Sequence, residues 1–217
     1  MKGRRGNEIS AARFIPVHPS LTSLREAAAG CEGCELYKRG TQTVFGEGRR
    51  TARVMIVGEQ PGNDEDLVGR PFVGPAGRLL DRALAEAGLD RAEIYVTNIV
   101  KHFKWKPQGK RRIHDKPNAS EVEACRPWFD AEIQLIRPEV LVCLGATAAQ
   151  ALLGRDFRIN AERGHFVESP LAPRVFATVH PSSLLRIPAE EARHAEMRRF
   201  IEELKLVART VQAADAR

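Results

Sequence analysis

The segment VMIVGEQPG, residues 54–62, decides the fold of this chain. It begins as an apolar run rich in β-branched residues and breaks into a Gly/Pro turn that carries the carboxylate of Glu59. A buried strand that ends in such a turn is typical of the site-bearing edge of an α/β sheet. Two later apolar runs end in the same way, the first delivering Asn98 and the second leading into His180. If the three strands are parallel, these polar side chains meet at one edge of the sheet.

Strand-like and helix-like segments alternate around this one, which predicts an α/β fold with three α/β/α layers and a central four-stranded parallel sheet. The expected strands cover about residues 53–58, 94–99, 139–144 and 174–179. The expected helices cover residues 23–29, 75–87, 120–136 and 146–153, and a long one follows residue 188. Loops are expected at 62–77 and 101–117, and a β-excursion at 158–170. We expect one domain over residues 1–217, with irregular termini at 1–20 and 208–217.

Two of the expected helices carry recognisable end signals. Pro75 opens one of them and Gly88 ends it. Ser120 and Glu123 have the spacing of a capping box at the start of the next.

The composition limits the class of protein and of partner. The chain has 217 residues and a net charge of +6, with a pI near 9.4. This size fits one α/β domain or two small ones, and the charge favours a polyanion as partner. No segment approaches the roughly 20 apolar residues that a membrane helix needs. We expect a cytoplasmic protein without membrane contact, and a monomer, because no helix looks apolar all round.

Four cysteines occur without a secretory pattern, so metal ligands or core thiols are favoured over disulfides. Cys31 and Cys34 form a C-x2-C pair, and the candidates for further ligands are Cys125 and His102. Three thiolates and an imidazole suit a tetrahedral zinc ion or an iron–sulfur cluster. The alternative is that Cys125 is a buried thiol and His102 a loop residue. Cys143 falls in a strand and is expected to pack in the core.

The segment 101–116 interleaves many cations with Phe103 and Trp105. Cations neutralise phosphates and aromatic faces stack on exposed bases, so this loop predicts binding of nucleic acid. A solvated surface loop is the alternative interpretation.

The segment HPSSLLR, residues 180–186, can serve the same site. A neutral His180 can donate one proton to an oxyanion, and Ser182 and Ser183 can hold a phosphate. A helix cap after a strand would look the same, so the motif alone is weak.

Taken together, the motifs resemble the iron–sulfur branch of the uracil-DNA glycosylase superfamily. They follow in order from about residue 24 to 206 and comprise C-x2-C, GEQPG, GRPFVGPAG, an IYVTN strand, EVEACRPW, GATAAQALLG and HPSSLLR. Three departures from the ordinary pattern are Gln60 in place of Ala, His102 in place of a cysteine, and the insertion GKRRIH at 109–114. These departures resemble the UdgX group, whose members become covalently attached to uracil-containing DNA through the histidine of that insertion.

The resemblance implies a cofactor and a substrate. A [4Fe-4S] cluster would be held by Cys31, Cys34, His102 and Cys125. The substrate would be uracil in DNA, single-stranded or duplex, which must leave the base stack to be reached. The residues implied to bind DNA are Lys110, Arg111, Arg112, Ser182 and Ser183.

The resemblance also implies roles around the extruded base. Phe72 would stack on uracil and Asn98 would read its O4 and N3–H edge, with Gln60 as a further uracil-binding residue. His180 would donate to O2, and an ionised Glu59 would stabilise the positive sugar.

The role of His114 separates the alternatives that the sequence leaves open. In the first, His114 attacks the sugar carbon C1′ as a neutral nucleophile and stays attached. In the second, the protein is an ordinary turnover glycosylase that uses water. In the third, it is a non-catalytic nucleic-acid binding module that carries zinc or a cluster.

Overall fold

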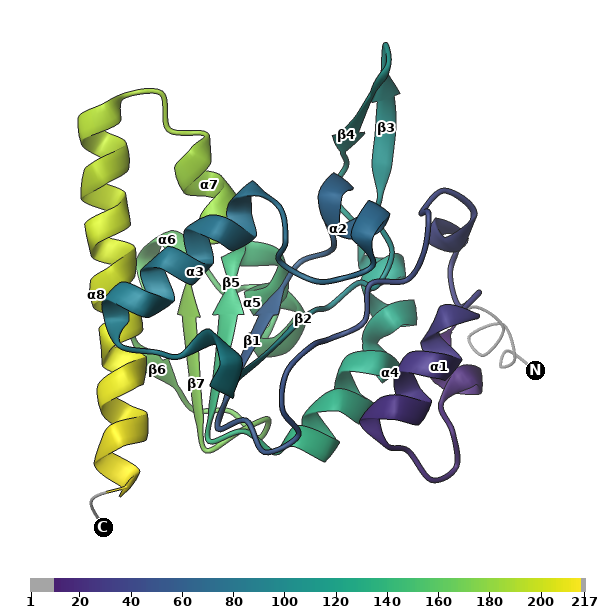
Figure 1. Ribbon diagram of the computed structural model, residues 1–217, viewed down its shortest axis with the longest axis horizontal. Coiled ribbons are helices and arrows are strands. Elements are labelled where there is room, and N and C mark those ends of the chain that lie inside the picture. The colour runs from purple at the N-terminus through teal and green to yellow at the C-terminus, as the bar shows by residue number, and fades with distance from the viewer. Residues whose placement is uncertain (1–9, 216–217) are drawn as a thin grey trace.

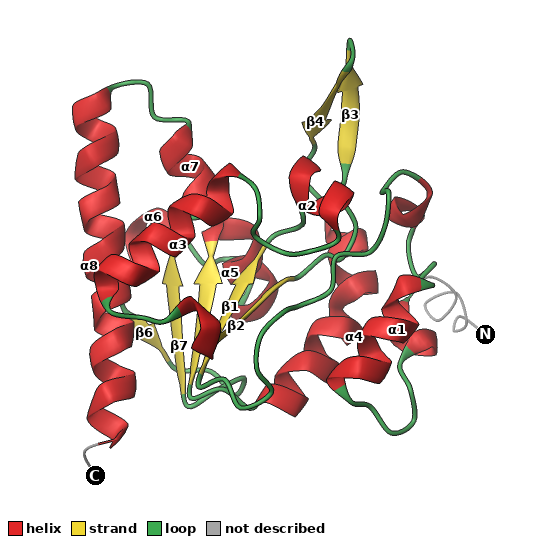
Figure 2. Ribbon diagram, viewed as in Figure 1, coloured by secondary structure: helices red, strands yellow, loops and turns green. Residues whose placement is uncertain are grey.

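A mostly parallel five-stranded sheet runs through the middle of the computed structural model, which describes residues 10–215 (Figures 1 and 2). The strand order is β2-β1-β5-β7-β6. Four strands are parallel: β1 (Val54–Gly58), β2 (Ile94–Asn98), β5 (Val140–Leu144) and β7 (Arg174–Thr178). These are the four predicted strands. The fifth, β6 (Phe166–Val167), pairs antiparallel with β7 at the edge, so the sheet has one strand more than the sequence predicted.

Alternate residues of the strands face two separate apolar cores, which confirms the three-layer arrangement. On β1, Met55 and Val57 face one core, and Val54 and Ile56 face the other. The first core is covered by α1 (Leu21–Ala29), α4 (Ala119–Ile136), α5 (Gly145–Leu153) and the 3₁₀ helix η1 (Ala11–Phe14). The second is covered by α3 (Pro75–Ala87), α7 (Pro181–Leu185) and α8 (Glu190–Asp215). Strands buried on both faces read as continuous apolar runs, and this made them visible in the sequence.

Several helix ends differ from the predicted ones. Helix α3 begins at Pro75 and is followed by Gly88 as predicted. Helix α4, however, is capped by Asn118, whose side chain accepts from the Glu121 backbone N–H, and not by a Ser120–Glu123 box. Helix α8 continues to Asp215, so the expected irregular C-terminus from 208 is wrong. The irregular N-terminus was predicted partly on residues 1–9, which lie outside the described residues, and η1 interrupts the rest.

Two segments predicted as loops contain regular structure, and a third, predicted as a β-excursion, contains a strand as expected. Residues 62–77 contain α2 (Asn63–Val68), and residues 101–117 contain an antiparallel hairpin of β3 (Trp105–Gln108) and β4 (Arg111–His114). Residues 158–170 contain α6 (Ile159–Glu162) as well as the edge strand β6. Short 3₁₀ helices lie at η2 (Glu35–Lys38) and η3 (Arg91–Glu93). The hairpin projects from the body beside α2 (Figure 1).

The strand order creates a crevice at the carboxyl ends of β1 and β5. The connection from β1 to β2 passes through α3 on one face, and the connection from β2 to β5 passes through α4 on the other. The loops that leave β1 and β5 therefore diverge, and ligand sites of open α/β sheets lie at such points. No helix among residues 10–215 is long and apolar enough to cross a membrane.

A buried ion pair joins the sheet to α4. The side chains of Lys101 and Glu132 are fully buried, and Lys101 Nζ lies 2.6 Å from Glu132 Oε2. The ammonium also donates to Thr97 Oγ1 at 2.6 Å and to the Asn98 carbonyl at 2.8 Å, which uses all three of its protons. The sequence counted Lys101 among the cations of the basic loop, but the structure places it in the interior.

We expect Lys101→Met to be strongly destabilising, because it leaves the Glu132 carboxylate buried without its cation. Breaking a buried pair from one side costs about 3–5 kcal/mol, which lowers the melting temperature of a chain of this size by roughly 6–20 °C. Calorimetry should place the double variant Lys101→Met/Glu132→Gln between the single variant and the wild type, since it removes both charges. A single variant that melts with the wild type would contradict this account.

Candidate active site

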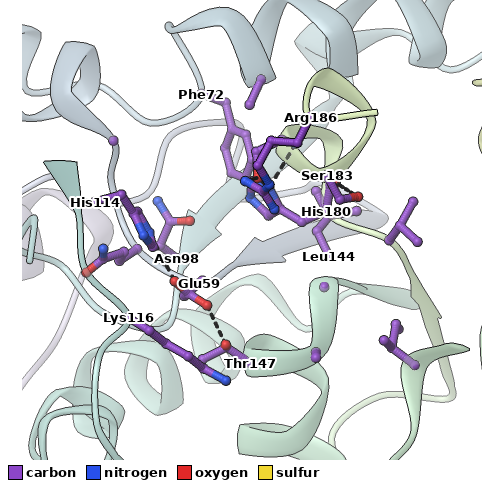
Figure 3. A pocket seen from close by; sticks show the side chains of 18 of the residues that line it. Glu59, Phe72, Asn98, His114, Lys116, Leu144, Thr147, His180, Ser183 and Arg186 are labelled. Carbon is purple, nitrogen blue, oxygen red and sulfur yellow. Dashed lines mark hydrogen bonds and ion pairs between the residues drawn. The ribbon is translucent and has the colours of Figure 1, made fainter. Parts of the chain in front are cut away.

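A cavity of about 760 Å³ opens at the carboxyl ends of the parallel strands. Glu59 follows β1, Asn98 ends β2, Gly145 follows β5 and His180 follows β7, and all four line it. His114, the last residue of β4, lines it from the hairpin. The structure thus brings together the three strand-end groups that the sequence singled out, and adds the histidine of the insertion (Figure 3).

Asn98, Phe72 and His180 line the cavity, and all three come close to Gly58 at the end of β1. A Cβ built on Gly58 would lie 2.4 Å from Asn98 Oδ1, 2.9 Å from Phe72 Cζ and 3.5 Å from His180 Nε2. Only glycine leaves this space free, so an amide, an aromatic edge and an imidazole nitrogen face the same small volume. The rings of Phe72 and His180 are nearly parallel, with centroids 6.1 Å apart.

The hydrogen bonds of His180 determine which ring nitrogen carries its proton. The backbone N–H of Ser182 donates to Nδ1 at 3.2 Å, so Nδ1 is the acceptor and Nε2 carries the proton of the neutral ring. Burial lowers the pKa of His180 to about 4, so the ring is neutral near pH 7. A neutral Nε2–H is therefore available as a donor to a ligand in the cavity.

The two oxygens of Glu59 have different partners (Figure 3). Oε1 lies 3.1 Å from His114 Nε2, and Oε2 accepts a hydrogen bond from the Thr147 hydroxyl. Burial pushes the pKa of Glu59 upward, but the hydrogen bonds from His114 and Thr147 outweigh it, and the net pKa lies below its ordinary value. Glu59 is an ionised carboxylate near pH 7, held in one orientation.

Gln60 fastens the base of the hairpin. Its Oε1 accepts from the Lys104 backbone N–H at 3.0 Å, and its Nε2 donates to the carbonyls of Lys104 and Asp115 at 3.1 and 3.0 Å. The resemblance implied that Gln60 binds uracil. Although it borders the cavity, both polar atoms of its amide are engaged by backbone on either side of the hairpin, which gives Gln60 a structural role.

Arg112 fastens the hairpin to α2. Its Nη1 lies 2.6 Å from Asp66 Oδ2, and its Nε donates to Asn63 Oδ1 at 2.9 Å. The guanidinium also packs over the rings of Phe103 and Trp105, at 5.5 and 5.7 Å from their centroids. Arg112 was expected to contact DNA, but the structure turns it inward against the protein.

The other residues expected to bind DNA lie on two sides of the cavity. Lys110 and Arg111 are exposed at the far end of the hairpin. Ser182 and Ser183 line the opposite rim, where the Ser183 hydroxyl donates to the His180 carbonyl at 2.7 Å. Arg186 on the same rim donates to Ser182 Oγ at 3.2 Å, and sequence reasoning gave it no role.

The four expected cluster ligands, Cys31, Cys34, His102 and Cys125, are all buried. Among the described residues, no three His, Cys, Asp or Glu side chains meet in the arrangement that a single metal ion needs. Cys125 nevertheless lies within the electrostatic field of both other cysteines. A four-iron cluster bonds each ligand through a different iron, so its ligands lie further apart than around one ion.

The donors around the cysteine sulfurs also fit such a cluster. Trp128 Nε1 donates to Cys31 Sγ and the Lys101 backbone N–H donates to Cys125 Sγ, both at 3.3 Å. Burial raises the pKa of the metal-free Cys125 thiol to about 12, and a bound cation reverses this preference by stabilising the thiolate. Hydrogen bonds to the sulfurs are a usual feature of iron–sulfur sites. Cys143 is buried on β5 as expected.

Besides Arg186, Thr147 is a residue of the cavity that sequence reasoning missed. Thr147 lies in the GATAAQALLG segment, directly after the strand that ends at Leu144. Glu59 was identified because it is a polar residue just beyond the end of a buried parallel strand. Thr147 lies just beyond the end of β5 in the same way, so the same criterion would have identified Thr147.

Comparison with known proteins identifies a family for this arrangement. Residues 45–205 match the uracil DNA glycosylase superfamily. The chain is 39% identical over 169 residues to the Type-4 uracil-DNA glycosylase of Thermotoga maritima, covering 77% of this chain and 84% of that protein. It is 38% identical over 176 residues to the Type-4 uracil-DNA glycosylase of Pyrobaculum aerophilum, covering 78% of this chain and 86% of that protein. The Type-5 uracil-DNA glycosylase of Thermus thermophilus is 34% identical over 151 residues, covering 62% of this chain and 65% of that protein.

We expect Arg112→Ala to loosen the hairpin, because the variant loses the contacts to Asp66 and to both aromatic rings. Hydrogen–deuterium exchange of the β3 and β4 amides should accelerate, while exchange in β1 and β5 stays as in the wild type. Arg111→Ala is the matched control, since Arg111 is its exposed neighbour on the same strand. Equal exchange in the two variants would contradict an anchoring role for Arg112.

Proposed function

The chain belongs to the uracil DNA glycosylase superfamily, and we propose that it excises uracil from DNA and then becomes covalently linked to the DNA. In this proposal the covalent bond joins His114 to the abasic sugar that excision leaves. The observation that carries this proposal is the contact of 3.1 Å between His114 Nε2 and Glu59 Oε1 inside the cavity. This contact supports a role for His114 as the nucleophile, acting beside Glu59 as the carboxylate that stabilises the sugar.

The convergence on Gly58 supports the recognition of uracil. An amide at Asn98 can donate to O4 and accept from N3–H, and the reversed edge of cytosine would leave both groups unpaired. Phe72 offers an aromatic face to the extruded base. The buried amide of Asn98 favours a base with this pattern of donors and acceptors.

The protonation of His180 and Glu59 supports the bond cleavage. The glycosidic bond breaks between C1′ and N1, and its electron pair leaves with uracil. His180 Nε2–H donates to uracil O2, where negative charge develops, and a neutral donor suits an anion that must then depart. The lowered pKa of Glu59 supports an ionised carboxylate, which in this proposal stabilises the positive charge that develops on the sugar.

His114 supports capture in place of hydrolysis. The ring nitrogen that bears the lone pair forms the new bond to C1′, while the other keeps its proton, so the product is an imidazolium-linked sugar. The negative charge of Glu59 stabilises that imidazolium as well. Gln60 and Arg112 hold the hairpin so that the ring occupies the space in which a water would otherwise approach.

DNA contacts are proposed on both rims of the cavity. Lys110 and Arg111 reach out from the hairpin, and Ser182, Ser183 and Arg186 lie opposite, so a strand that delivers its base to the cavity passes between two polar rims. The net charge of +6 adds a general attraction for the backbone. We leave Arg112 out of this set, because protein groups already engage it.

We also propose a [4Fe-4S] cluster held by Cys31, Cys34, His102 and Cys125. Such a cluster can exchange electrons, but its proposed role here is structural. Its ligands would tie the N-terminal segment to the chain that leaves β2 and to α4. Lys101, next to His102, donates to Cys125 Sγ and to the Asn98 carbonyl, so the cluster region and the uracil pocket share one residue.

The names of the relatives favour one alternative. They are called uracil-DNA glycosylases, which is consistent with ordinary turnover by water, with His114 as a bystander. Capture yields a covalent protein–DNA adduct and turnover yields free abasic DNA, so one experiment distinguishes the two functions.

We expect wild-type protein mixed with single-stranded DNA that contains one uracil to give a shifted band on a denaturing gel. His114→Ala should lose this band, because it removes the only atom that forms the bond to C1′. His165→Ala is the matched control, since His165 is exposed and lies outside the cavity. A wild type that releases free abasic DNA in excess over protein, without a shifted band, would establish turnover and overturn capture.

The cluster is tested by comparing two buried cysteines. We expect Cys125→Ala to lose bound iron and visible absorption, because one iron then lacks its ligand. Cys143→Ala should keep both, since Cys143 packs on β5 away from the proposed ligands. Equal iron content per chain in the two variants would exclude Cys125 from the ligand set.

A further inference from the structure

The GATAAQALLG segment at 145–154 supplies part of the active site that the reaction above does not use. It forms α5, directly after β5, and ends with the Gly154 cap. The carboxyl ends of β1 and β5 border the crevice where the sheet reverses its order. Residues that follow these two strands are therefore brought together, and the pair that meets is Glu59 and Thr147.

Gly145 allows the segment to approach this closely. Its φ is +86°, a left-handed conformation that favours glycine. A Cβ at this position would lie 2.9 Å from the His180 Cβ. The turn after β5 is thus packed against the residue that follows β7, and this packing fixes where Thr147 lies.

We propose that Thr147 is a positioning residue that holds the Glu59 carboxylate in the orientation required for capture by His114. The inference deepens the proposed function and rests on it. The Thr147 hydroxyl donates to Oε2, which leaves Oε1 for His114. Without this donor the carboxylate is free to rotate about its terminal torsion, which has a broad and nearly two-fold preference.

The hydroxyl also favours the charged form of Glu59. Hydrogen bonds to a carboxylate stabilise its ionised state, and those from His114 and Thr147 together overcome the effect of burial on its pKa. His114 and His180 are the titratable groups that act on Glu59, and Glu65, Lys116 and Arg186 share its cavity. Thr147 is a neutral donor, so it stabilises the ionised carboxylate through a hydrogen bond alone.

Thr147→Val tests this role, because valine keeps the shape and removes the donor. Loss of a hydrogen bond to a charged group should slow single-turnover capture by about tenfold near pH 7. The pKa of Glu59 should rise, so the acid limb of the rate profile should move to higher pH. Thr147→Ser keeps the hydroxyl and should restore both the rate and the limb. Thr210→Val is the matched control, because the Thr210 hydroxyl only donates to a helix carbonyl.

A second measurement keeps the inference independent of the proposed function. The Glu59 carboxyl can be titrated by carbon NMR in DNA-free protein, with Glu59→Gln to identify its signal. We expect its midpoint to rise in Thr147→Val and to stay at the wild-type value in Thr147→Ser. Should valine disturb the fold, as judged by circular dichroism, Thr147→Ala removes the same donor without an added branch.

The outcomes separate the two ideas. A wild type that excises uracil without forming an adduct overturns capture, while the titration still decides for or against Thr147. A Thr147→Val variant with wild-type rate, acid limb and Glu59 midpoint overturns the inference. A general loss of rate without any shift of the limb or midpoint, unrepaired by serine, also overturns it, because that pattern indicates only a disturbed fold.

Discussion

The buried ion pair between Lys101 and Glu132 is the interaction on which the active site depends most. Taking two charges out of water is costly, and such a pair is tolerated when every donor and acceptor finds a partner. Here the ammonium reaches a carboxylate, a hydroxyl and the Asn98 carbonyl, and Glu132 Oε1 also accepts from the Tyr95 hydroxyl. Because these partners come from β2 and α4, the pair fixes the end of the strand that carries Asn98. The same lysine donates its backbone N–H to Cys125 Sγ, so the proposed uracil pocket and the proposed cluster region share one residue.

The site divides its parts between the sheet and an appended hairpin. Glu59, Asn98 and His180 each leave the end of a different parallel strand, so their mutual positions follow from the register of the sheet. His114 comes from a two-stranded ribbon outside both apolar cores. Such a ribbon is marginal by itself in water. Polar contacts hold it instead: the Gln60 amide spans its base, and Arg112 joins it to Asp66.

The sequence was sufficient to predict elements whose residue pattern is set by burial. It was insufficient to predict polar contacts between residues that lie far apart along the chain. Strands buried on both faces appear as apolar runs, and Pro75 and Gly88 mark the ends of α3, so most of the layered fold was predictable. The hairpin was missed because neither face of its strands is apolar, which leaves no alternation to detect. Gln60 and Arg112 were assigned to ligands because their true partners lie 44 or more positions away in sequence. Lys101 was assigned to the surface for the same reason, since its carboxylate partner lies 31 positions away.

Burial also explains how two histidines in one cavity can have different proposed roles, His180 as a hydrogen-bond donor and His114 as a nucleophile. His180 is desolvated and anchored through Nδ1, so it stays neutral and offers a single N–H to the cavity, which in the proposed reaction receives the departing base. His114 has a side chain that is 51% exposed and reaches the cavity from outside, where its orientation depends on Glu59 alone among the strand-end groups. The proposed reaction therefore requires Glu59 to be ionised, to favour charge on the sugar, and oriented, to present one oxygen to His114. A carboxylate with only one fixed partner meets the first requirement but not the second. The Thr147 hydroxyl, near the start of the helix that follows β5, meets the second requirement. Because the topology of the sheet brings the ends of β1 and β5 together, it also determines which oxygen of Glu59 the His114 imidazole contacts.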